Sequence, residues 1–375
     1  MRRVKIGIVG VGNIGSAHAS TIYSGLASTL ELCALCDNDE KRASELKEEY
    51  RDIQIYSSYE EMIDSGKIEA VIISTPHYLH PVIATYSLNK GICVLSEKPL
   101  GVYTLSLKEP FEAQKKTNAL YAAMLNQRTD KLFIEAKKII DSGKIGTLIR
   151  NSWIITNWYR TDEYYQSGGW RATWQGEGGG VLMNQAPHNL DLWQYLCGMP
   201  KRICAVCNEG KLHDIEVEDE ATVYAEYENG MSGTFIASTG EKYGTNRFEI
   251  VGAKGKIVLE KGKLLCQYEK NGEEYKIEYS DEEYNGHLNI LNNFGEAILY
   301  GKKLIAPATE AVNQLILCNS AYLSSWKGEW VQLPFDEGEF LELLSKRVKN
   351  SKAKGTQVGT NLFENSYKKK WSTNW

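Results

Sequence analysis

The sequence lacks two features that mark common protein classes. Its 375 residues hold no apolar run near the roughly 18 residues of a membrane-spanning helix, so no such helix is predicted. It also lacks a basic surplus, because 43 Lys and Arg stand against 48 Asp and Glu, and this excludes a general nucleic-acid binder. Lys5, glycines and Asn13 interrupt the apolar start, which favours a first strand over a signal peptide. We therefore expect a cytoplasmic protein with neither a membrane nor a nucleic-acid partner.

The eight cysteines do not predict a metal site or a disulfide framework. Two C-x-x-C pairs are present, Cys33–Cys36 and Cys204–Cys207, and this spacing is also found in zinc sites. Both pairs lie in strand-like runs, where residues three apart point to opposite faces. We expect buried, reduced thiols and no bound metal, because a cytosolic chain of this length needs no disulfides to complete its core.

The first 125 residues alternate short apolar runs with amphipathic stretches. Helical patterns separate the runs, and this alternation is typical of a doubly wound parallel sheet. We therefore expect an α/β protein whose first domain covers residues 1–125. The strand-like runs lie at residues 4–9, 32–36, 70–73, 92–95 and 121–124.

A different pattern follows, in which strands succeed one another. One helical pattern covers 181–197, and strand-like runs between 203 and 279 are separated by three glycine-containing turn signals. Closely spaced strands of this kind favour a large, mostly antiparallel open sheet. At about 150 residues per domain, the length agrees with a second domain, which we place at 126–345, with a polar tail over 346–375.

A glycine-rich turn joins the first strand to the first helix. Gly10, Gly12 and Gly15 form G-x-G-x-x-G, with Asn13 and Ile14 inside the motif. This pattern is weak by itself, but a preceding strand and a following helix are the context that supports it. The glycines allow a tight turn and a close approach to a pyrophosphate, and the helix N-terminus supplies N–H donors. The alternative is a glycine-rich turn that binds nothing.

Asp37 ends the second predicted strand, 22 residues after Gly15. A carboxylate at this point accepts hydrogen bonds from both hydroxyls of an adenosine ribose, and it repels a 2′-phosphate. The sequence therefore predicts NAD, in preference to NADP, as the cofactor.

Two polar clusters follow later strands. Ser74, Thr75 and Pro76 come directly after the run at 70–73, and Glu97-Lys98-Pro99 follows the run at 92–95. The carboxyl ends of parallel strands are where α/β sheets bind ligands. Pro99 also keeps Lys98 out of helical geometry. Taken alone, Glu97-Lys98-Pro99 would equally suit a surface turn.

Together with the segment GGGVLMNQAPHNLDLW at 178–193, these motifs resemble the Gfo/Idh/MocA oxidoreductases, the relatives of glucose-fructose oxidoreductase and inositol dehydrogenase. The resemblance covers residues 1 to about 340. It implies a Rossmann domain, a substrate-binding and oligomerisation domain, and NAD-dependent oxidation of a secondary hydroxyl of a sugar, glycoside or polyol. It also implies a homo-oligomer joined through the C-terminal sheet.

By this resemblance, Lys98 and His188 are the expected catalytic residues. Lys98 matches the lysine that lies close to the reacting hydroxyl, and His188 is the candidate general base. Many relatives carry an aspartate four residues before the histidine, where this chain has Asn184. An amide binds a hydroxyl but takes up no proton at neutral pH, so we expect Asn184 to bind substrate. Asp191 is a candidate to support His188 from the same helix, although a structural pairing suits it equally.

The stretch 153–195 holds nine of the chain's 39 aromatic residues, and aromatic faces suit the C–H faces of pyranose rings. An aromatic core beneath a long loop is the alternative. The expected substrate contacts there are Thr156, Asn157, Tyr159 and Trp174. The further expected cofactor contacts are Ser74, Thr75, Pro76, His80, Glu97, Lys98, Gln127, Trp170 and Arg171.

Three functions remain open from the sequence. The first is a freely exchanging NAD-dependent dehydrogenase, whose substrates include pyranosides oxidised at C3. The second is a redox-neutral sugar-processing enzyme that retains its nicotinamide. The third is a non-catalytic NAD-binding sensor, which the joint presence of Lys98 and His188 argues against.

Overall fold

The computed structural model describes residues 2–280 and 284–352 of the chain, and these form two compact units. Residues 285–315 belong with the N-terminal part, so the first unit is discontinuous in sequence, unlike the serial division at 125/126 that we expected. Of the described residues, the first unit holds 2–129 and 285–315, and the second holds 130–280, 284 and 316–352.

The first unit is built on a six-stranded sheet in the order β3-β2-β1-β4-β5-β6, and all paired strands in it are parallel. This confirms the doubly wound parallel sheet. Strands β2 and β3 lie on one side of β1, and β4, β5 and β6 lie on the other, so the strand order reverses between β1 and β4. Doubly wound sheets bind ligands at such a switch point. The strands are β1 (Val4–Val9), β2 (Leu30–Cys36), β3 (Gln54–Tyr56), β4 (Ala70–Ile73), β5 (Cys93–Ser96) and β6 (Tyr121–Ala123).

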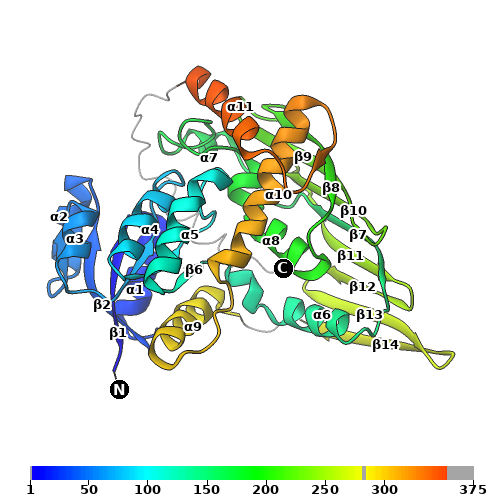
Figure 1. Ribbon diagram of the computed structural model, residues 1–375, viewed down its shortest axis with the longest axis horizontal. Helices are drawn as coiled ribbons and strands as arrows, with labels where there is room; N and C mark the ends of the chain where they lie inside the picture. Colours follow the sequence, from blue (N-terminus) through cyan, green and yellow to red (C-terminus); the bar gives the residue numbers. More distant parts are fainter. Residues whose placement is uncertain (1, 281–283, 353–375) are drawn as a thin grey trace. The chain divides into compact units, whose positions relative to one another are not determined.

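Helices connect these strands, as Figure 1 shows. Local caps set where several of them begin: the Asp39 side chain accepts the Arg42 N–H at 3.0 Å at the start of α2, and Ser58 accepts the Glu61 N–H at the start of α3. The helices of this unit are α1 (Asn13–Tyr23), α2 (Glu40–Glu49), α3 (Tyr59–Asp64), α4 (Leu79–Asn89), α5 (Lys108–Thr117) and α9 (Gly286–Tyr300).

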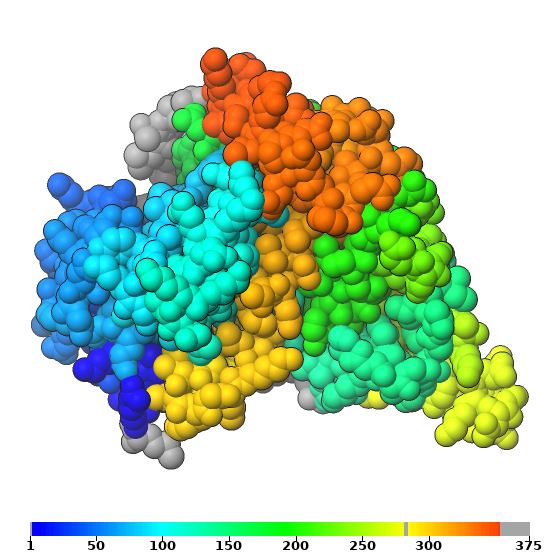
Figure 2. All heavy atoms as spheres, viewed as in Figure 1, coloured from blue at the N-terminus to red at the C-terminus, as the bar shows by residue number. Residues whose placement is uncertain are grey.

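Helix α9 joins the first unit although it lies far along the chain. Its buried residues Ile290, Leu291 and Phe294 belong to the same apolar core as residues of β1 and β2. In Figure 2 the surface of α9, in gold, adjoins the dark-blue N-terminal strand. Burial of this apolar face explains why residues 285–315 pack with the N-terminal sheet.

The second unit contains a nine-stranded sheet in the order β14-β13-β12-β11-β7-β10-β9-β8-β15. Only the β10–β7 pair is parallel among the described pairs, so the expected mostly antiparallel sheet is confirmed. Both C-x-x-C pairs lie in strands, on β2 and β8. The strands are β7 (Leu148–Ile155), β8 (Arg202–Glu209), β9 (Glu218–Glu226), β10 (Ser232–Ser238), β11 (Asn246–Gly252), β12 (Gly255–Glu260), β13 (Lys263–Lys270), β14 (Glu273–Ser280) and β15 (Val331–Gln332).

The helix expected over 181–197 is two pieces. A π-helical turn covers Val181–Gln185, and α8 begins at Pro187, which has no N–H to continue the ladder. Within this unit α6 and α8 contact the sheet, and Figure 1 shows them on one face of it. The expected tail from 346 begins inside α11, and its part beyond residue 352 lies outside the described residues. The remaining helices are α6 (Lys131–Asp141), α7 (Asp162–Gln166), α8 (Pro187–Cys197), α11 (Glu337–Asn350) and α10 (Ala308–Lys327), which continues from one unit into the other.

Trp153, on β7, is central to the core of the second unit. Its ring stacks on Phe248 with centroids 4.3 Å apart, and it contacts Phe235 edge-on. Its indole N–H donates to Asn246 Oδ1 at 3.0 Å. This aromatic residue therefore packs in the interior, as the core alternative for the 153–195 stretch requires.

Candidate active site

The predicted site residues fall into two sets, one in each unit. In the first unit the glycine-rich turn has the geometry that its sequence requires. Gly10 has φ = 83°, and a Cβ on it would lie 2.8 Å from the Ser74 carbonyl. A Cβ on Gly15 would lie 2.0 Å from the Gly10 oxygen, so this contact between turn and helix admits only glycine. The Ser74 hydroxyl donates to the Gly10 oxygen at 2.9 Å and ties the turn to the end of β4.

Gly12 shows that the turn can take a ligand. Within the described residues, a Cβ built on Gly12 meets no atom within 4 Å, so its hydrogen faces open space. Gly12 is also the N-cap of α1, and in that part of the chain no side chain caps the helix. Exposed N–H groups and the positive end of the helix dipole at this point fit a pyrophosphate.

Asp37 is half-buried and held in place by backbone donors. Its Oδ2 accepts the Val11 N–H at 2.8 Å, and its Oδ1 accepts the Asp39 N–H at 3.1 Å. Each carboxylate oxygen keeps further acceptor capacity, as contact with ribose hydroxyls requires. Arg42 lies close by and donates to the Val11 oxygen at 2.7 Å.

His80 connects the two loops that follow β4 and β5. Its Nδ1 lies 2.7 Å from the Pro99 oxygen and its Nε2 lies 2.7 Å from the Thr75 oxygen. Complete burial lowers the pKa of His80, while the two carbonyl acceptors and the charge of Glu97 oppose this shift. With both nitrogens occupied, His80 serves as a positioning group between these loops.

Two cofactor candidates present unsatisfied polar atoms. Thr75 Oγ1 and Gln127 Oε1 are buried and have no hydrogen-bond partner in the described part of the chain. Such atoms are costly in a protein interior and point to a missing polar ligand. With the space at Gly12 and the orientation of Asp37, they show that this unit fits a dinucleotide.

Glu97, which precedes Lys98 in the chain, belongs to a buried polar cluster that the sequence reasoning missed. Glu97 Oε1 is 2.7 Å from His18 Nε2, and the rings of His18 and His287 are 5.6 Å apart. Burial alone would raise the pKa of Glu97, but the hydrogen bond from His18 and the charges of His18, His287 and Lys98 lower it to about 2. The burial of His287 itself lowers the pKa of its imidazole to about 4. The sequence held one indication that His18 is buried near the site: it lies three residues after Gly15 and thus on the same, buried face of α1.

The residues of the second set lie in the second unit. His188 is the second residue of α8 and is half-buried. Asp191, one turn further on, is buried and accepts the Gln194 amide at 3.1 Å, a contact that agrees with the structural alternative. Pro187 occupies the first position of α8, which suits a residue without an N–H, and it fixes where the helix bearing His188 begins.

Asn184 lies on the π-helical turn and donates its side-chain amide to Glu177 Oε1. Glu177 is 2% exposed, and its Oε2 accepts the Ala172 N–H at 2.6 Å. Glu177 is a further residue that sequence reasoning missed, because no spacing rule links it to Asn184. A buried carboxylate therefore contacts the side chain that we expect to bind substrate.

Trp170 and Arg171 lie next to this contact. The Arg171 guanidinium lies 4.7 Å from the Trp170 ring centroid and 4.8 Å from that of Tyr164. It also donates to the Tyr164 hydroxyl at 2.9 Å. The pair forms a cationic and aromatic surface element, which is compatible with the expected contact to a cofactor.

The four expected substrate contacts of the aromatic stretch differ in exposure. Thr156 is buried, donates to Glu241 at 2.7 Å and accepts the Thr245 N–H at 2.9 Å. Trp174 is also buried and packs edge-on against two aromatic rings of α10. Asn157 is exposed and Tyr159 is half-buried, so these two offer the more accessible side chains.

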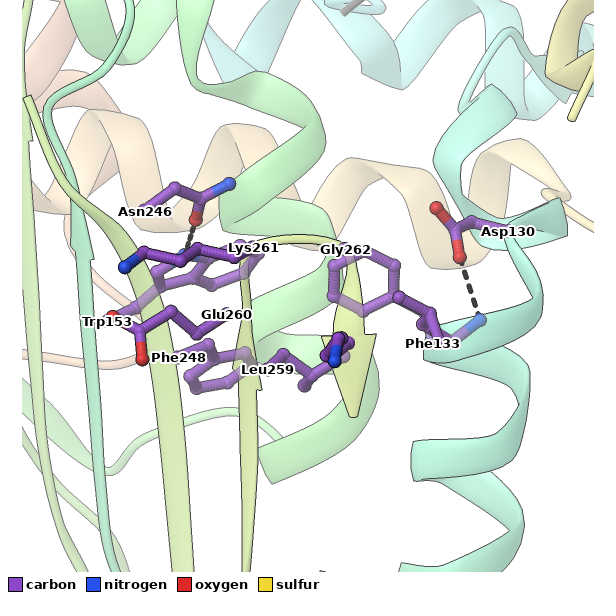
Figure 3. A pocket seen from close by; sticks show the side chains of 11 residues that line it. Asp130, Phe133, Trp153, Asn246, Phe248, Leu259, Glu260, Lys261 and Gly262 are labelled. Atoms are coloured by element: carbon purple, nitrogen blue, oxygen red, sulfur yellow. Dashed lines mark hydrogen bonds between the residues drawn. The ribbon is translucent and has the colours of Figure 1, made fainter. Parts of the chain in front are cut away.

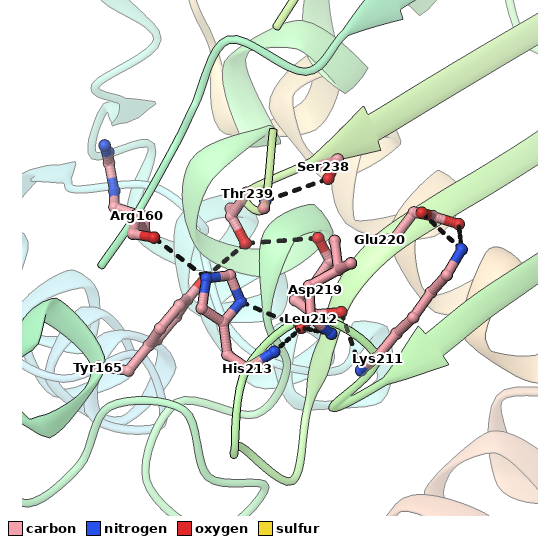
Figure 4. Close-up of polar contacts among 10 residues, drawn as sticks. Arg160, Tyr165, Lys211, Leu212, His213, Asp219, Glu220, Ser238 and Thr239 are labelled. Atoms are coloured by element: carbon pink, nitrogen blue, oxygen red, sulfur yellow. Dashed lines mark hydrogen bonds and ion pairs between the residues drawn. The ribbon is translucent and has the colours of Figure 1, made fainter. Parts of the chain in front are cut away.

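Figure 4 shows how the segment bearing Arg160 is anchored. His213 Nδ1 lies 3.1 Å from Asp219 Oδ2, and His213 Nε2 lies 3.0 Å from the Arg160 oxygen. Asp219 is fully buried and also accepts the N–H groups of Leu212 and His213. Because both ring nitrogens of His213 are occupied, this Asp–His pair is structural.

Glu218 holds the start of the π-helical turn. Its carboxyl group accepts the Gly180 N–H at 2.8 Å, the Leu182 N–H at 2.9 Å and the Tyr322 hydroxyl at 2.7 Å. Burial raises its pKa to about 8, and the three donors oppose this shift. The glycine-rich segment before Asn184 is thus fixed by a buried acid on β9.

The cavity in Figure 3 lies apart from these residues within the second unit. It is bounded by the start of α6, the Trp153–Phe248 stack and the turn between β12 and β13, and it includes none of the predicted site residues. Among the described residues, no group of three or more His, Cys, Asp or Glu is arranged to hold a metal ion. In the same ranges, no helix combines the length and apolar character needed to cross a bilayer.

Family models match both units. The "Oxidoreductase family, NAD-binding Rossmann fold" model matches residues 4–124, and the "GFO/IDH/MocA C-terminal domain" model matches residues 133–258. The chain belongs to the Gfo/Idh/MocA oxidoreductases. It is therefore an oxidoreductase with NAD as its cofactor, and the family and cofactor predictions are confirmed.

Individual relatives agree with this assignment. The chain is 28% identical to scyllo-inositol 2-dehydrogenase (NAD(+)) of Bacillus subtilis, over 88% of this chain and 96% of that enzyme. It is 26% identical to levoglucosan dehydrogenase of Pseudarthrobacter phenanthrenivorans, over 69% and 74% of the two chains. The solved WlbA dehydrogenase of Bordetella pertussis, in complex with NADH and UDP-GlcNAcA, has the same fold, with a TM-score of 0.78, 23% identity and coverage of 89% and 100%.

Proposed function

We propose that the protein oxidises a secondary hydroxyl of a sugar, glycoside or polyol, with NAD as the hydride acceptor. The observation that carries this proposal is the position of Lys98, directly after β5 of an NAD-binding Rossmann unit and beside the buried Glu97–His18 pair. The relatives named above support the substrate class, since they act on an inositol and on an anhydrosugar.

When bound to this unit, NAD would supply an electrophilic nicotinamide C4 as the hydride acceptor. The chain's own residues handle the charge and the proton. The Lys98 ammonium stabilises the negative charge that develops on the substrate oxygen. The His188 imidazole accepts the hydroxyl proton, because a neutral imidazole is a base near neutral pH. Both groups thereby lower the barrier to formation of the carbonyl product.

Substrate and cofactor contacts extend this proposal. Asn184 binds a substrate hydroxyl, and the aromatic stretch supplies Thr156, Asn157, Tyr159 and Trp174. Trp170 and Arg171 contact the cofactor. The N-Q-A-P-H sequence at 184–188 and the aromatic stretch favour a pyranoside oxidised at C3 to a 3-oxo glycoside.

We further propose that the protein is a cytoplasmic homo-oligomer joined through the nine-stranded sheet. Ile149, Val206 and Tyr224 expose 52%, 57% and 39% of their surface from strands of this sheet, and association would bury them. The eight cysteines are free thiols, as in proteins of a reducing compartment.

A direct assay tests the proposed activity. Purified protein is mixed with NAD or NADP and challenged with hexoses, inositols, anhydrosugars and aryl glucosides, while the absorbance of reduced nicotinamide is followed. We expect a rise with NAD and a pyranoside or polyol, and a far slower rise with Lys98→Ala. If no sugar gives a rise, the protein is denatured and assayed for released nicotinamide. Nicotinamide released from the denatured protein would favour the redox-neutral enzyme over the freely exchanging dehydrogenase.

A further inference from the structure

We propose that Glu177 is a positioning residue that sets the direction of the Asn184 amide and thereby makes Asn184 a hydrogen-bond acceptor for substrate. This inference rests on the proposed function, in which Asn184 binds a substrate hydroxyl. The observation behind it is the direct contact between the Glu177 carboxylate and the Asn184 side-chain nitrogen, both within the second unit.

The contact fixes which end of the amide faces Glu177. An ionised carboxylate only accepts hydrogen bonds, so Glu177 Oε1 selects the NH₂ end of Asn184. The Asn184 oxygen consequently points away from Glu177. Glu177 is itself immobilised, because it is 2% exposed and its other oxygen accepts the Ala172 N–H at 2.6 Å.

The hydrogen bond from the Ala172 N–H also connects Glu177 to the backbone turn at Ala172. Ala172 has φ = 55°, a left-handed conformation that a residue with a Cβ rarely adopts without support. The N–H of this residue is the donor that Glu177 holds. Arg171 Nη1 lies 4.0 Å from Glu177 Oε1 and is a charged group that faces the carboxylate. Tyr165 is a titratable neighbour of Glu177: burial and, to a smaller extent, the charge of Glu177 raise the pKa of the Tyr165 hydroxyl. One carboxylate therefore fixes both the turn at Ala172 and the Asn184 side chain.

This arrangement explains why position 184 carries an amide. An aspartate there would place two carboxylates within hydrogen-bond distance in a buried site, and one of them would have to take up a proton. Asn184 and Glu177 together supply the single negative charge that an aspartate would bring, with the charge shifted to Glu177. The chain thereby presents a neutral acceptor, which suits the uncharged hydroxyl of a sugar or polyol.

Four variants test the inference: Glu177→Gln, Asn184→Asp, the double variant, and Glu216→Gln as a matched control. Glu216 accepts the Trp174 N–H at 2.8 Å, so its substitution perturbs the same loop through a different carboxylate. A glutamine in place of Glu177 has one side-chain oxygen and cannot accept from both Ala172 and Asn184 in the same geometry. We therefore expect Glu177→Gln to lower kcat/KM about 10- to 100-fold, with the substrate KM raised. The control keeps the wild-type pH profile.

Asn184→Asp provides the discriminating readout. In this variant two carboxylates lie side by side, so the pKa of one of them is raised in the folded protein. As pH rises through that pKa, the site gains a second negative charge, and kcat/KM of the variant should fall in a pH range where kcat/KM of the wild type does not. In the double variant the introduced glutamine amide donates to the introduced carboxylate, the extra titration is lost, and the wild-type profile shape returns. Unchanged KM in Glu177→Gln, or a wild-type pH profile in Asn184→Asp, would overturn the inference.

The inference can fail separately from the proposed function. The unfolding midpoint of Asn184→Asp, relative to the wild type, should rise on acidification, because a raised folded-state pKa adds stability that is lost as pH rises through it. The double variant should lack this dependence. If the wild type oxidises no sugar, the proposed function fails, while these unfolding data still decide whether Glu177 and residue 184 interact.

Discussion

His18 Nε2 lies 2.7 Å from Glu97 Oε1, and both side chains are buried. His18 comes from α1, the helix that opens the glycine-rich turn, and Glu97 precedes Lys98 after β5. This pair therefore links the element expected to bind phosphate to the loop that carries the expected catalytic lysine. The Lys98 N–H also donates to the other Glu97 oxygen at 3.3 Å, so the acid restrains the lysine backbone directly.

The Glu97 carboxylate should make stability depend on acid pH. Its folded-state pKa is about 2, below the ordinary value of 4.5, because His18 and the neighbouring charges outweigh the effect of burial. A lowered folded-state pKa adds stability that is present above pH 4.5 and is lost as pH falls toward 2. We expect the difference in unfolding free energy between wild type and Glu97→Gln to shrink over this range. Urea unfolding at a series of pH values measures it, and parallel curves for the two proteins would exclude this role.

Lys98→Ala should reduce kcat by about 100- to 10,000-fold with a much smaller loss of NADH affinity, because the lysine stabilises charge that develops only during reaction. The assay compares steady-state rates with NADH titrations followed by fluorescence. Lys90→Ala is the matched control, since Lys90 pairs with Asp64 on the surface of the same unit at 2.8 Å. A Lys98→Ala variant with near-normal kcat would remove Lys98 from the reaction.

Asp37→Ala should weaken the preference for NAD over NADP. The carboxylate is the acceptor for ribose hydroxyls, and its charge repels a 2′-phosphate. Arg42, whose guanidinium donates to the Val11 oxygen, remains close to this position, and its positive charge attracts a phosphate. We expect KM for NAD to rise about tenfold and KM for NADP to fall, an estimate based on loss of a charge-assisted hydrogen bond. An unchanged ratio of kcat/KM for the two cofactors would contradict the assignment.

Local sequence patterns predicted the glycine-rich turn and the alternating strands and helices of the parallel sheet, because each of these depends on neighbouring residues. Gly10 and Gly15 are required by contacts within a few residues of the turn and with the adjacent strand. The family resemblance supplied Lys98 and His188 as catalytic candidates, and their roles stay predictions. The sequence did not reveal that α9 belongs to the first unit, since this depends on which apolar surface covers which.

The polar partners of the site were harder to predict. Glu97 and His18 are 79 residues apart, and only the folded sheet and helix bring them together. Glu177 and Asn184 are separated by seven residues, but an irregular glycine-rich segment and a π-helical turn lie between them. Regular periodicity fails across such a segment, so the contact could not be read from spacing.

Asp219→Asn should destabilise the second unit far more than Glu220→Gln, its sequence neighbour. Asp219 is fully buried and accepts backbone N–H groups as well as His213, as Figure 4 shows. An asparagine would turn an NH₂ group toward one of these donors, and removing an acceptor from a buried charged network costs about 2–4 kcal/mol. Glu220 instead pairs with the half-exposed Lys211, a type of contact worth about 0–1 kcal/mol. Urea unfolding gives both differences.

The same substitution should also release the segment that His213 holds through the Arg160 oxygen. Hydrogen exchange of the Leu212 and His213 amides should accelerate in Asp219→Asn and stay unchanged in Glu220→Gln, since Asp219 Oδ2 accepts both N–H groups. Because Tyr159 directly precedes Arg160, a substrate that contacts Tyr159 should then show a raised KM with little change in kcat. Equal exchange rates in the two variants would mean that other contacts hold this segment.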